Sequence, residues 1–135
     1  MRFTGKSVVI TGATGGLGRA AAQRFYDEGA NIALVDLHQK DIDALLQTFD
    51  ADSRRIIGIE ADVSKDTDVK NYVKETMATF GRIDTLFNNA GIEGSISSLE
   101  DYEEEIFDRV VQVNIKGVWF GMRYCADAMR KSGGG

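Results

Sequence analysis

A glycine-rich run near the N-terminus has the residue types that hold phosphate groups. It reads Thr11-Gly12-Ala13-Thr14-Gly15-Gly16-Leu17-Gly18 and lies between an apolar run and a segment of helical period, the context that a dinucleotide fingerprint requires. Gly12 would allow a tight turn, Gly16 would let the backbone approach a pyrophosphate, and Gly18 would let a helix pack closely on a sheet. Free N–H groups of the first helical turn, near Leu17, would face the negative charge.

Asp36 follows Gly18 by 18 residues, at the end of the next apolar run. Dinucleotide-binding folds place an acid there to accept a hydrogen bond from the ribose 2′-OH, although such an aspartate could also cap the next helix. A carboxylate repels a 2′-phosphate, and no Arg or Lys lies in the glycine run or immediately after Asp36. The sequence therefore favours NAD over NADP. We expect Thr14, Gly15 and Leu37 to line the same site.

These residues need a sheet to position them, and the sequence alternates apolar runs with segments of helical period. The runs lack polar alternation, which suits parallel strands covered on both faces, and they span residues 7–10, 31–35, 56–59 and 83–87. Strand and helix alternating in this way predict an α/β fold of the Rossmann type, a doubly wound parallel sheet. Right-handed crossovers would place its strands in the order 3-2-1-4.

A long helix is expected from about Leu99 to Lys131, after a polar loop over residues 89–98. Its acidic start suits a helix N-terminus: Glu100, Asp101, Glu103, Glu104 and Glu105. One apolar face runs through Ile106, Val110 and Val113, and a second through Phe107, Val111, Ile115, Trp119 and Met122. The second face needs its own cover, either the rest of a larger fold or a partner subunit, so we expect a homo-oligomer formed through this helix.

The composition excludes several other classes of protein. The 135 residues make one domain, residues 1–135, and the net charge of −5 gives no electrostatic footprint for nucleic acid or an anionic membrane. A single cysteine, Cys125, forbids an intrachain disulfide, and a single histidine, His38, cannot anchor a histidine-based metal site. We expect a cytoplasmic protein that contains no metal and has neither nucleic acid nor membrane as a partner.

Three further motifs accompany the glycine run, in a fixed order. They are Asp62-Val63 after the third apolar run, Asn88-Asn89-Ala90-Gly91 after the fourth, and Val113-Asn114 in the long helix. Taken singly they could be capping residues, a turn and a helix kink. Together they resemble the short-chain dehydrogenase/reductase family over residues 4–135. Gly12, Gly15 and Gly18 also fit the extended branch that includes nucleotide-sugar epimerases, but the Asn-Asn-Ala-Gly run favours the single-domain dehydrogenase branch.

The resemblance implies a role for each motif. Asp62 would accept a hydrogen bond from the adenine amino group, with the backbone of Val63 beside the ring. Asn88 would help to tie strands together, and Asn114 would hold a water in the family's proton relay. The residues that would line the cofactor near its ribose and nicotinamide are Asn89, Ala90 and Gly91.

The family's chemistry transfers a hydride between the cofactor and an alcohol or carbonyl. It uses a tyrosine whose pKa is lowered by a lysine four residues later, and a serine that orients the substrate. The four tyrosines are followed at that spacing by Ala30, Thr76, Ile106 and Ala128, and the serines at 95, 97 and 98 lie in the wrong loop. We therefore expect the N-terminal part of an NAD-dependent enzyme acting on a small alcohol or ketone. By itself this part would be inactive and marginally stable, with the fourth strand as an unpaired edge. A non-catalytic NAD-binding module is the alternative.

Overall fold

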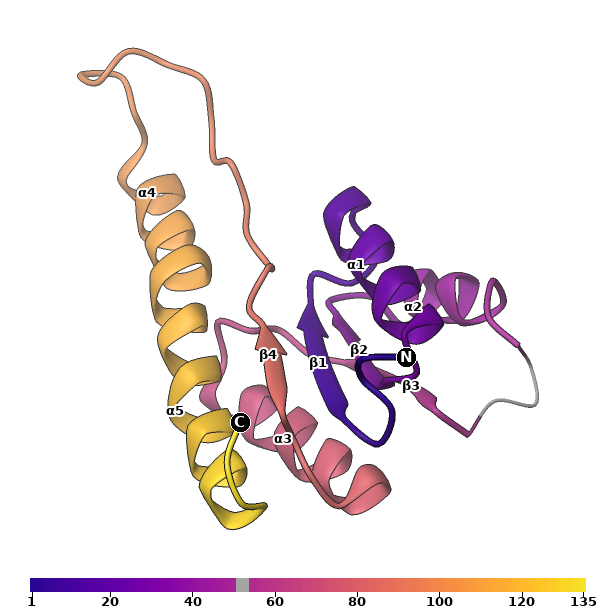
Figure 1. Cartoon of the computed structure of the whole chain (residues 1–135). Helices are drawn as coiled ribbons and strands as arrows, with labels where there is room; N and C mark the ends of the chain where they lie inside the picture. The colour runs from indigo at the N-terminus through magenta and orange to yellow at the C-terminus, as the bar shows by residue number, and fades with distance from the viewer. Residues whose placement is uncertain (51–53) are drawn as a thin grey trace.

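The computed structural model describes residues 1–50 and 54–135. Its centre is a parallel sheet in the order β3-β2-β1-β4 (Figure 1), which confirms the predicted Rossmann-type topology. The strands are β1 (Ser7–Thr11), β2 (Asn31–Asp36), β3 (Ile56–Glu60) and β4 (Thr85–Phe87). All three neighbouring pairs are parallel, so the carboxyl ends of the strands meet at one edge of the sheet, where the predicted site residues lie.

Helices cover both faces of the sheet, which is why the strands are apolar throughout. On one face, α1 (Gly16–Asp27) and α2 (Gln39–Leu46) pack over Val8 and Ile10 of β1. On the other, α3 (Asp66–Phe80) and α5 (Val118–Lys131) pack over Val9 of β1. Alternate residues of β1 therefore belong to opposite layers of the core, and every residue of the strand is buried.

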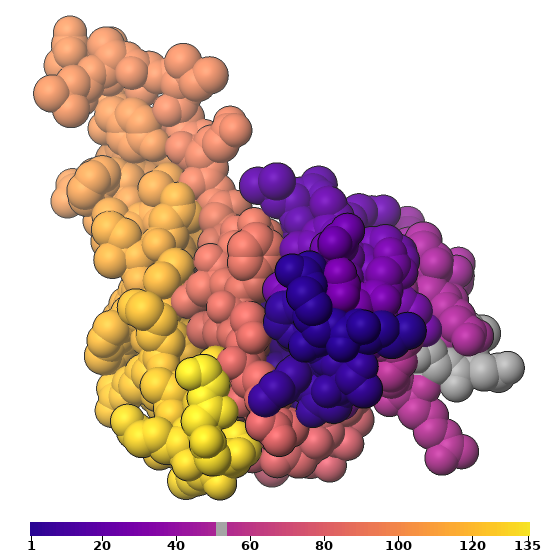
Figure 2. Space-filling model, in the orientation of Figure 1, coloured from indigo at the N-terminus to yellow at the C-terminus, as the bar shows by residue number. Residues whose placement is uncertain are grey.

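The long C-terminal helix begins later than the sequence predicted. It comprises α4 (Glu104–Val111), a π-helical segment η1 (Gln112–Gly117) and α5. The start near Leu99 is wrong because a hydrogen bond from Ser98 Oγ to Asp101 Oδ2 closes a turn there and Glu103 is extended. Of the acidic residues, only Glu104 and Glu105 lie in the first turn. Figure 2 shows α4 and the preceding loop standing clear of the rest of the molecule.

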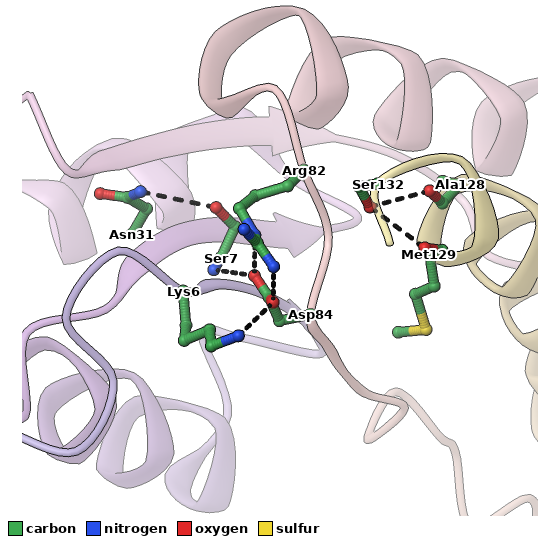
Figure 3. A network of polar contacts seen from close by, with 8 residues as sticks. All are labelled: Lys6, Ser7, Asn31, Arg82, Asp84, Ala128, Met129 and Ser132. Atoms are coloured by element: carbon green, nitrogen blue, oxygen red, sulfur yellow. Dashed lines mark hydrogen bonds and ion pairs between the residues drawn. The ribbon is translucent and has the colours of Figure 1, made fainter. Parts of the chain in front are cut away.

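Strand β4 lies at the edge of the sheet, because among the described residues it pairs only with β1. The prediction of an unpaired edge is confirmed. Asp84, just before β4, fixes the start of this strand (Figure 3): its carboxylate accepts hydrogen bonds from Ser7 N (2.9 Å), Arg82 Nε (2.7 Å) and Lys6 Nζ (3.1 Å). Burial alone would raise the pKa of Asp84, but the hydrogen bonds from Arg82, Ser7 and Lys6 lower it to about 2.

Two other kinds of feature are not found in the described part of the chain. No helix within residues 1–50 and 54–135 is both long enough and apolar enough to cross a membrane. In the same ranges, no three His, Cys, Asp or Glu side chains come together in a way that could hold a metal ion.

Candidate cofactor-binding site

The glycine run forms the turn between β1 and α1. Gly12 has a φ of +64°, and a Cβ there would lie 2.9 Å from Cα of Ala90, so a side chain is excluded by both strain and space. A Cβ on Gly18 would lie 2.2 Å from the carbonyl oxygen of Gly12, so α1 can start this close to the strand only with glycine. A Cβ on Gly16 would meet nothing within 4 Å, and the space above this residue is open to a ligand.

The Asp36 carboxylate is held by backbone and side-chain donors. Its Oδ2 accepts hydrogen bonds from Thr14 N (2.8 Å) and Thr14 Oγ1 (2.9 Å), and its Oδ1 accepts one from Leu37 N (2.8 Å). Asp36 does not cap α2, since the helix's first N–H, on Gln39, donates to Glu60 instead (2.7 Å). Its carboxylate is thus fixed beside the glycine run, where the ribose interpretation requires it.

A cation that is not among the predicted site residues also contacts the glycine run. Arg19, one residue past Gly18, donates a hydrogen bond from Nε to the carbonyl oxygen of Thr14 (2.6 Å). This contact holds the peptide that follows Thr14, next to the one whose N–H donates to Asp36.

The two asparagines after β4 contact different parts of the fold. Asn89 donates from Nδ2 to the carbonyl oxygens of Thr11 and Gly12 (both 3.1 Å), which ties the loop after β4 to the end of β1. Asn88, which the resemblance implied would tie strands together, instead donates to the carbonyl oxygen of Val118 (2.9 Å) and holds the start of α5. Adjacent side chains of extended backbone point in opposite directions, so one of the pair faces β1 and the other the helix.

Asn114 lies in the π-helical segment and clamps the loop after β4. Its Oδ1 accepts a hydrogen bond from Ile92 N (2.9 Å) and its Nδ2 donates one to Ile92 O (2.8 Å). Short π-helical segments inside α-helices are frequent at functional sites. The side-chain amide is engaged at both ends, so the water that the resemblance implies for Asn114 stays a prediction.

Asp62 lies two residues beyond the end of β3 and belongs to a polar network. Its Oδ1 accepts hydrogen bonds from Ser64 N (3.0 Å) and Ser64 Oγ (2.5 Å), while Arg109 NH2 lies 3.5 Å from Oδ2. Gln112 Nε2 donates to the carbonyl oxygen of Ser64 (2.7 Å). Burial raises the pKa of Asp62, but the Ser64 hydrogen bonds and the Arg109 charge outweigh burial and hold the pKa below its usual value.

Arg109 and Gln112 are not among the site residues predicted from the sequence. The sequence places Arg109 four residues before Val113 of the Val113-Asn114 motif and so on the same face of the helix, but it does not show which residues Arg109 contacts.

These residues surround two adjoining cavities that share Gly12, Asp36, Ala90 and Gly91. The first, of about 150 Å³, has mostly apolar walls and is also lined by Leu37, Ala61, Asp62, Val63, Ile92, Arg109 and Val113. The second, of about 590 Å³, is also lined by Thr14, Gly15, Gly16, Leu17, Asn89 and Glu93. Every predicted cofactor-binding residue except Gly18 therefore lines one of the two. An apolar slot that opens into a larger polar cleft beside a helix N-terminus suits a ring joined to phosphates.

Comparison with known proteins agrees with this geometry. Residues 6–135 match the family model described as short chain dehydrogenase. Levodione reductase of Leifsonia aquatica is 42% identical over 138 residues, which cover 99% of this chain and 51% of that protein. A solved structure of levodione reductase superposes with a TM-score of 0.91 at 41% identity, covering 99% of this chain and 53% of that one.

Two solved structures with a nicotinamide cofactor are also similar. NAD⁺-bound xylitol dehydrogenase has a TM-score of 0.94 at 30% identity, covering 100% of this chain and 52% of that one. The 3-ketoacyl-(acyl-carrier-protein) reductase of Brucella melitensis, complexed with NADH, has a TM-score of 0.89 at 34% identity, covering 96% and 52%. The chain spans about half the length of these proteins. The match of the family model over nearly all of the chain shows that it belongs to the short-chain dehydrogenase/reductase family.

Proposed function

We propose that this chain is the NAD-binding part of an oxidoreductase that moves a hydride between NAD and a small alcohol or carbonyl substrate. NAD, when bound, would accept or supply the hydride. In this proposal the N–H groups at the start of α1 face the pyrophosphate, Asp36 binds the ribose and Asp62 faces the adenine. The residues beside the nicotinamide and its ribose would be Asn89, Ala90 and Gly91.

The fixed carboxylate of Asp36 carries this proposal. Three hydrogen bonds from Thr14 and Leu37 hold it at the border of both cavities. A carboxylate has about four acceptor positions, so at least one remains for a ribose hydroxyl. A 2′-phosphate would instead bring negative charge against a carboxylate that cannot turn away. The NAD⁺ and NADH in the two similar structures support the same choice of cofactor.

Calorimetric titration with NAD and NADP tests the proposal. The wild-type chain should bind NAD more tightly than NADP. Asp36→Ala should weaken NAD binding about tenfold or more, because a hydrogen bond to a charged group contributes about 1.5–3 kcal/mol. The same change should strengthen NADP binding, and Asp43→Ala, an exposed carboxylate on α2, should alter neither. A wild-type preference for NADP, or no binding of either dinucleotide, would refute the proposal.

Within these 135 residues no tyrosine is followed by a lysine four positions later. We therefore expect the chain by itself to bind NAD without oxidising alcohols, a result that a non-catalytic NAD-binding module would also give. Any coding sequence downstream of Gly135 separates the two hypotheses. The proposed enzyme requires a serine followed by a Tyr-x3-Lys there, and the longer polypeptide should reduce ketones with NADH.

We also propose that a second copy of the chain covers the exposed stripe of the long helix, defined by Phe107, Ile115, Trp119 and Met122. These side chains are 56%, 64%, 46% and 53% exposed. Charged residues beside the stripe differ in sign along its length: Glu104 and Asp108 come first, whereas Lys116 and Arg123 come later. An antiparallel pair of helices would place each acidic end against the basic end of its partner, as a two-fold interface requires.

Size-exclusion chromatography with light scattering tests this interface, because it measures the mass of the eluting species. Trp119→Asp should shift a dimer to monomer at micromolar concentration without loss of helical circular dichroism, because it places a charge within the apolar stripe. Lys74→Asp on α3, away from the stripe, is the control. A wild-type monomer at high micromolar concentration would contradict the proposal.

A further inference from the structure

We infer that Arg109 is a positioning residue that sets the preference of the site for adenine over other purine rings. The inference rests on the proposed binding of NAD and concerns one edge of the smaller cavity. The two carboxylate oxygens of Asp62 differ in the contacts that they make.

Asp62 Oδ1 is fully engaged, since it accepts two hydrogen bonds from Ser64. Oδ2 has no hydrogen bond from any described residue, and faces only Arg109 NH2 at 3.5 Å and Lys65 Nζ at 4.0 Å. The side chain of Asp62 is only 12% exposed, so water has little access to it. A carboxylate oxygen that borders the cavity and accepts no hydrogen bond from the described residues has acceptor positions left for a ligand N–H.

Arg109 determines where that oxygen points. Its two terminal nitrogens act as a fork: NH1 donates to Ser64 Oγ (3.0 Å), and NH2 forms the ion pair with Asp62 Oδ2. Ser64 Oγ in turn donates to Asp62 Oδ1, so the guanidinium fixes both ends of the carboxylate at once. Lys65 could not replace it, because its side chain is 64% exposed and offers a single flexible ammonium.

The walls of the cavity define the matching ligand. Leu37, Val63 and Val113 provide apolar surfaces suited to the faces of a flat ring, and Asp62 provides an acceptor at its edge. An amino group on the ring would donate to Oδ2. A ring carbonyl at the same place would bring two acceptors together, so hypoxanthine should bind less well than adenine.

Titration with NAD and with nicotinamide hypoxanthine dinucleotide tests the inference. These ligands differ in the base alone, so their affinity ratio reports the contact at its edge. The wild-type chain should bind NAD about tenfold more tightly than the hypoxanthine analogue, the effect of one hydrogen bond to a charged acceptor. Arg109→Met keeps the apolar stem in the cavity wall but removes the fork. This change should weaken the binding of NAD about fivefold and that of the hypoxanthine analogue less than twofold, so that the ratio of the two affinities falls.

Two comparisons make the result specific. Arg130→Met, which removes an exposed helical arginine paired with Asp127, should leave both affinities unchanged. Asp62→Asn should bring the ratio close to one, since an amide can donate to a ring carbonyl as well as accept. Should Arg109→Met fail to fold, Arg109→Lys carries the test: it keeps the charge without the fork, and the ratio should still fall.

Failure of the inference about Arg109 can be distinguished from failure of the proposed NAD binding. Equal weakening of both dinucleotides by Arg109→Met would mean that Arg109 only supports the fold, and an unchanged ratio in Arg109→Lys or Asp62→Asn would also overturn the inference. In each of these cases NAD binding sensitive to Asp36→Ala would leave the proposed function intact. A wild-type chain that binds neither dinucleotide overturns both.

Discussion

Replacing Asp84 by Asn should destabilise the chain in a pH-dependent way. The Asp84 carboxylate joins the start of β4 to the start of β1 through Ser7, Lys6 and Arg82 (Figure 3). The asparagine amide keeps one acceptor, and its NH2 group would face N–H donors where the carboxylate accepted from them. The strand that leads to Asn89 and the cofactor cleft would therefore lose its main polar attachment to the sheet.

The magnitude follows from the pKa of Asp84. It is about 2 in the folded protein against an ordinary value of 3.8, and the side chain is only 7% exposed. This difference corresponds to about 2 kcal/mol of folding free energy at neutral pH. Because the folded pKa is the lower one, the stabilisation is present above pH 3.8 and is lost as the pH falls toward 2. About half of it, roughly 1 kcal/mol, should remain at pH 3.

Thermal melts followed by circular dichroism at pH 7 and pH 3 measure this effect. At pH 7 the wild-type chain should melt about 8 °C above Asp84→Asn, since each kcal/mol shifts the midpoint by about 4 °C at this length. At pH 3 the difference should be about half as large. Comparing the two proteins at each pH cancels the titration of the other carboxylates. Asp127→Asn, an exposed ion-pair control, should melt like the wild type. A difference that is the same at both pH values would refute this electrostatic account.

Three further predictions concern the loop, the thiol and the sheet edge. Gly18→Ala should lower the melting temperature and abolish NAD binding, because its Cβ would lie 2.2 Å from Gly12 O. Gly16→Ala should weaken NAD binding without lowering the melting temperature, because its Cβ would meet nothing within 4 Å. Identical effects of the two changes would contradict this reasoning. Burial raises the pKa of the Cys125 thiol to about 12, so a disulfide reagent at pH 8 should label it only after unfolding, and rapid labelling of the folded chain would count against this burial. With β4 as an open edge, the 135-residue chain should melt early or self-associate; a cooperative monomeric melt at ordinary temperature would contradict that expectation.

The sheet could be predicted from the sequence because its determinants are local. Apolar runs separated by helical periods require parallel strands covered on both faces, and right-handed crossovers then leave one strand order. The start of the long helix could not be predicted in the same way. Glu100 and Asp101 have the charges of a helix N-terminus, but the Ser98–Asp101 hydrogen bond and the bond between Tyr102 and Ser95 form a different local structure. Neither contact leaves a periodic signal.

In the candidate site too, some residues could be predicted from local sequence and others could not. Gly12, Gly18 and Asp36 could be identified because backbone geometry and strand ends fix their places. Arg109 acts through side-chain contacts with residues 45 and 47 positions away, Ser64 and Asp62, which no local pattern reveals. The separate contacts of Asn88 and Asn89 depend in the same way on which neighbour each side chain faces.

The π-helical segment follows from the pattern of burial along the long helix, which the sequence alone does not show. Among the buried residues of η1 and α5, four recur at every fourth position: Val113, Gly117, Gly121 and Cys125. In a regular α-helix each such step drifts by about 40° around the axis, so three steps would carry Cys125 about 120° away from Val113. One extra residue in a π turn restores about 100° of rotation. The π turn therefore keeps a single face of the helix against the protein from the Asp62 loop to the core of α5, while Asn114, within the turn itself, points to the loop after β4.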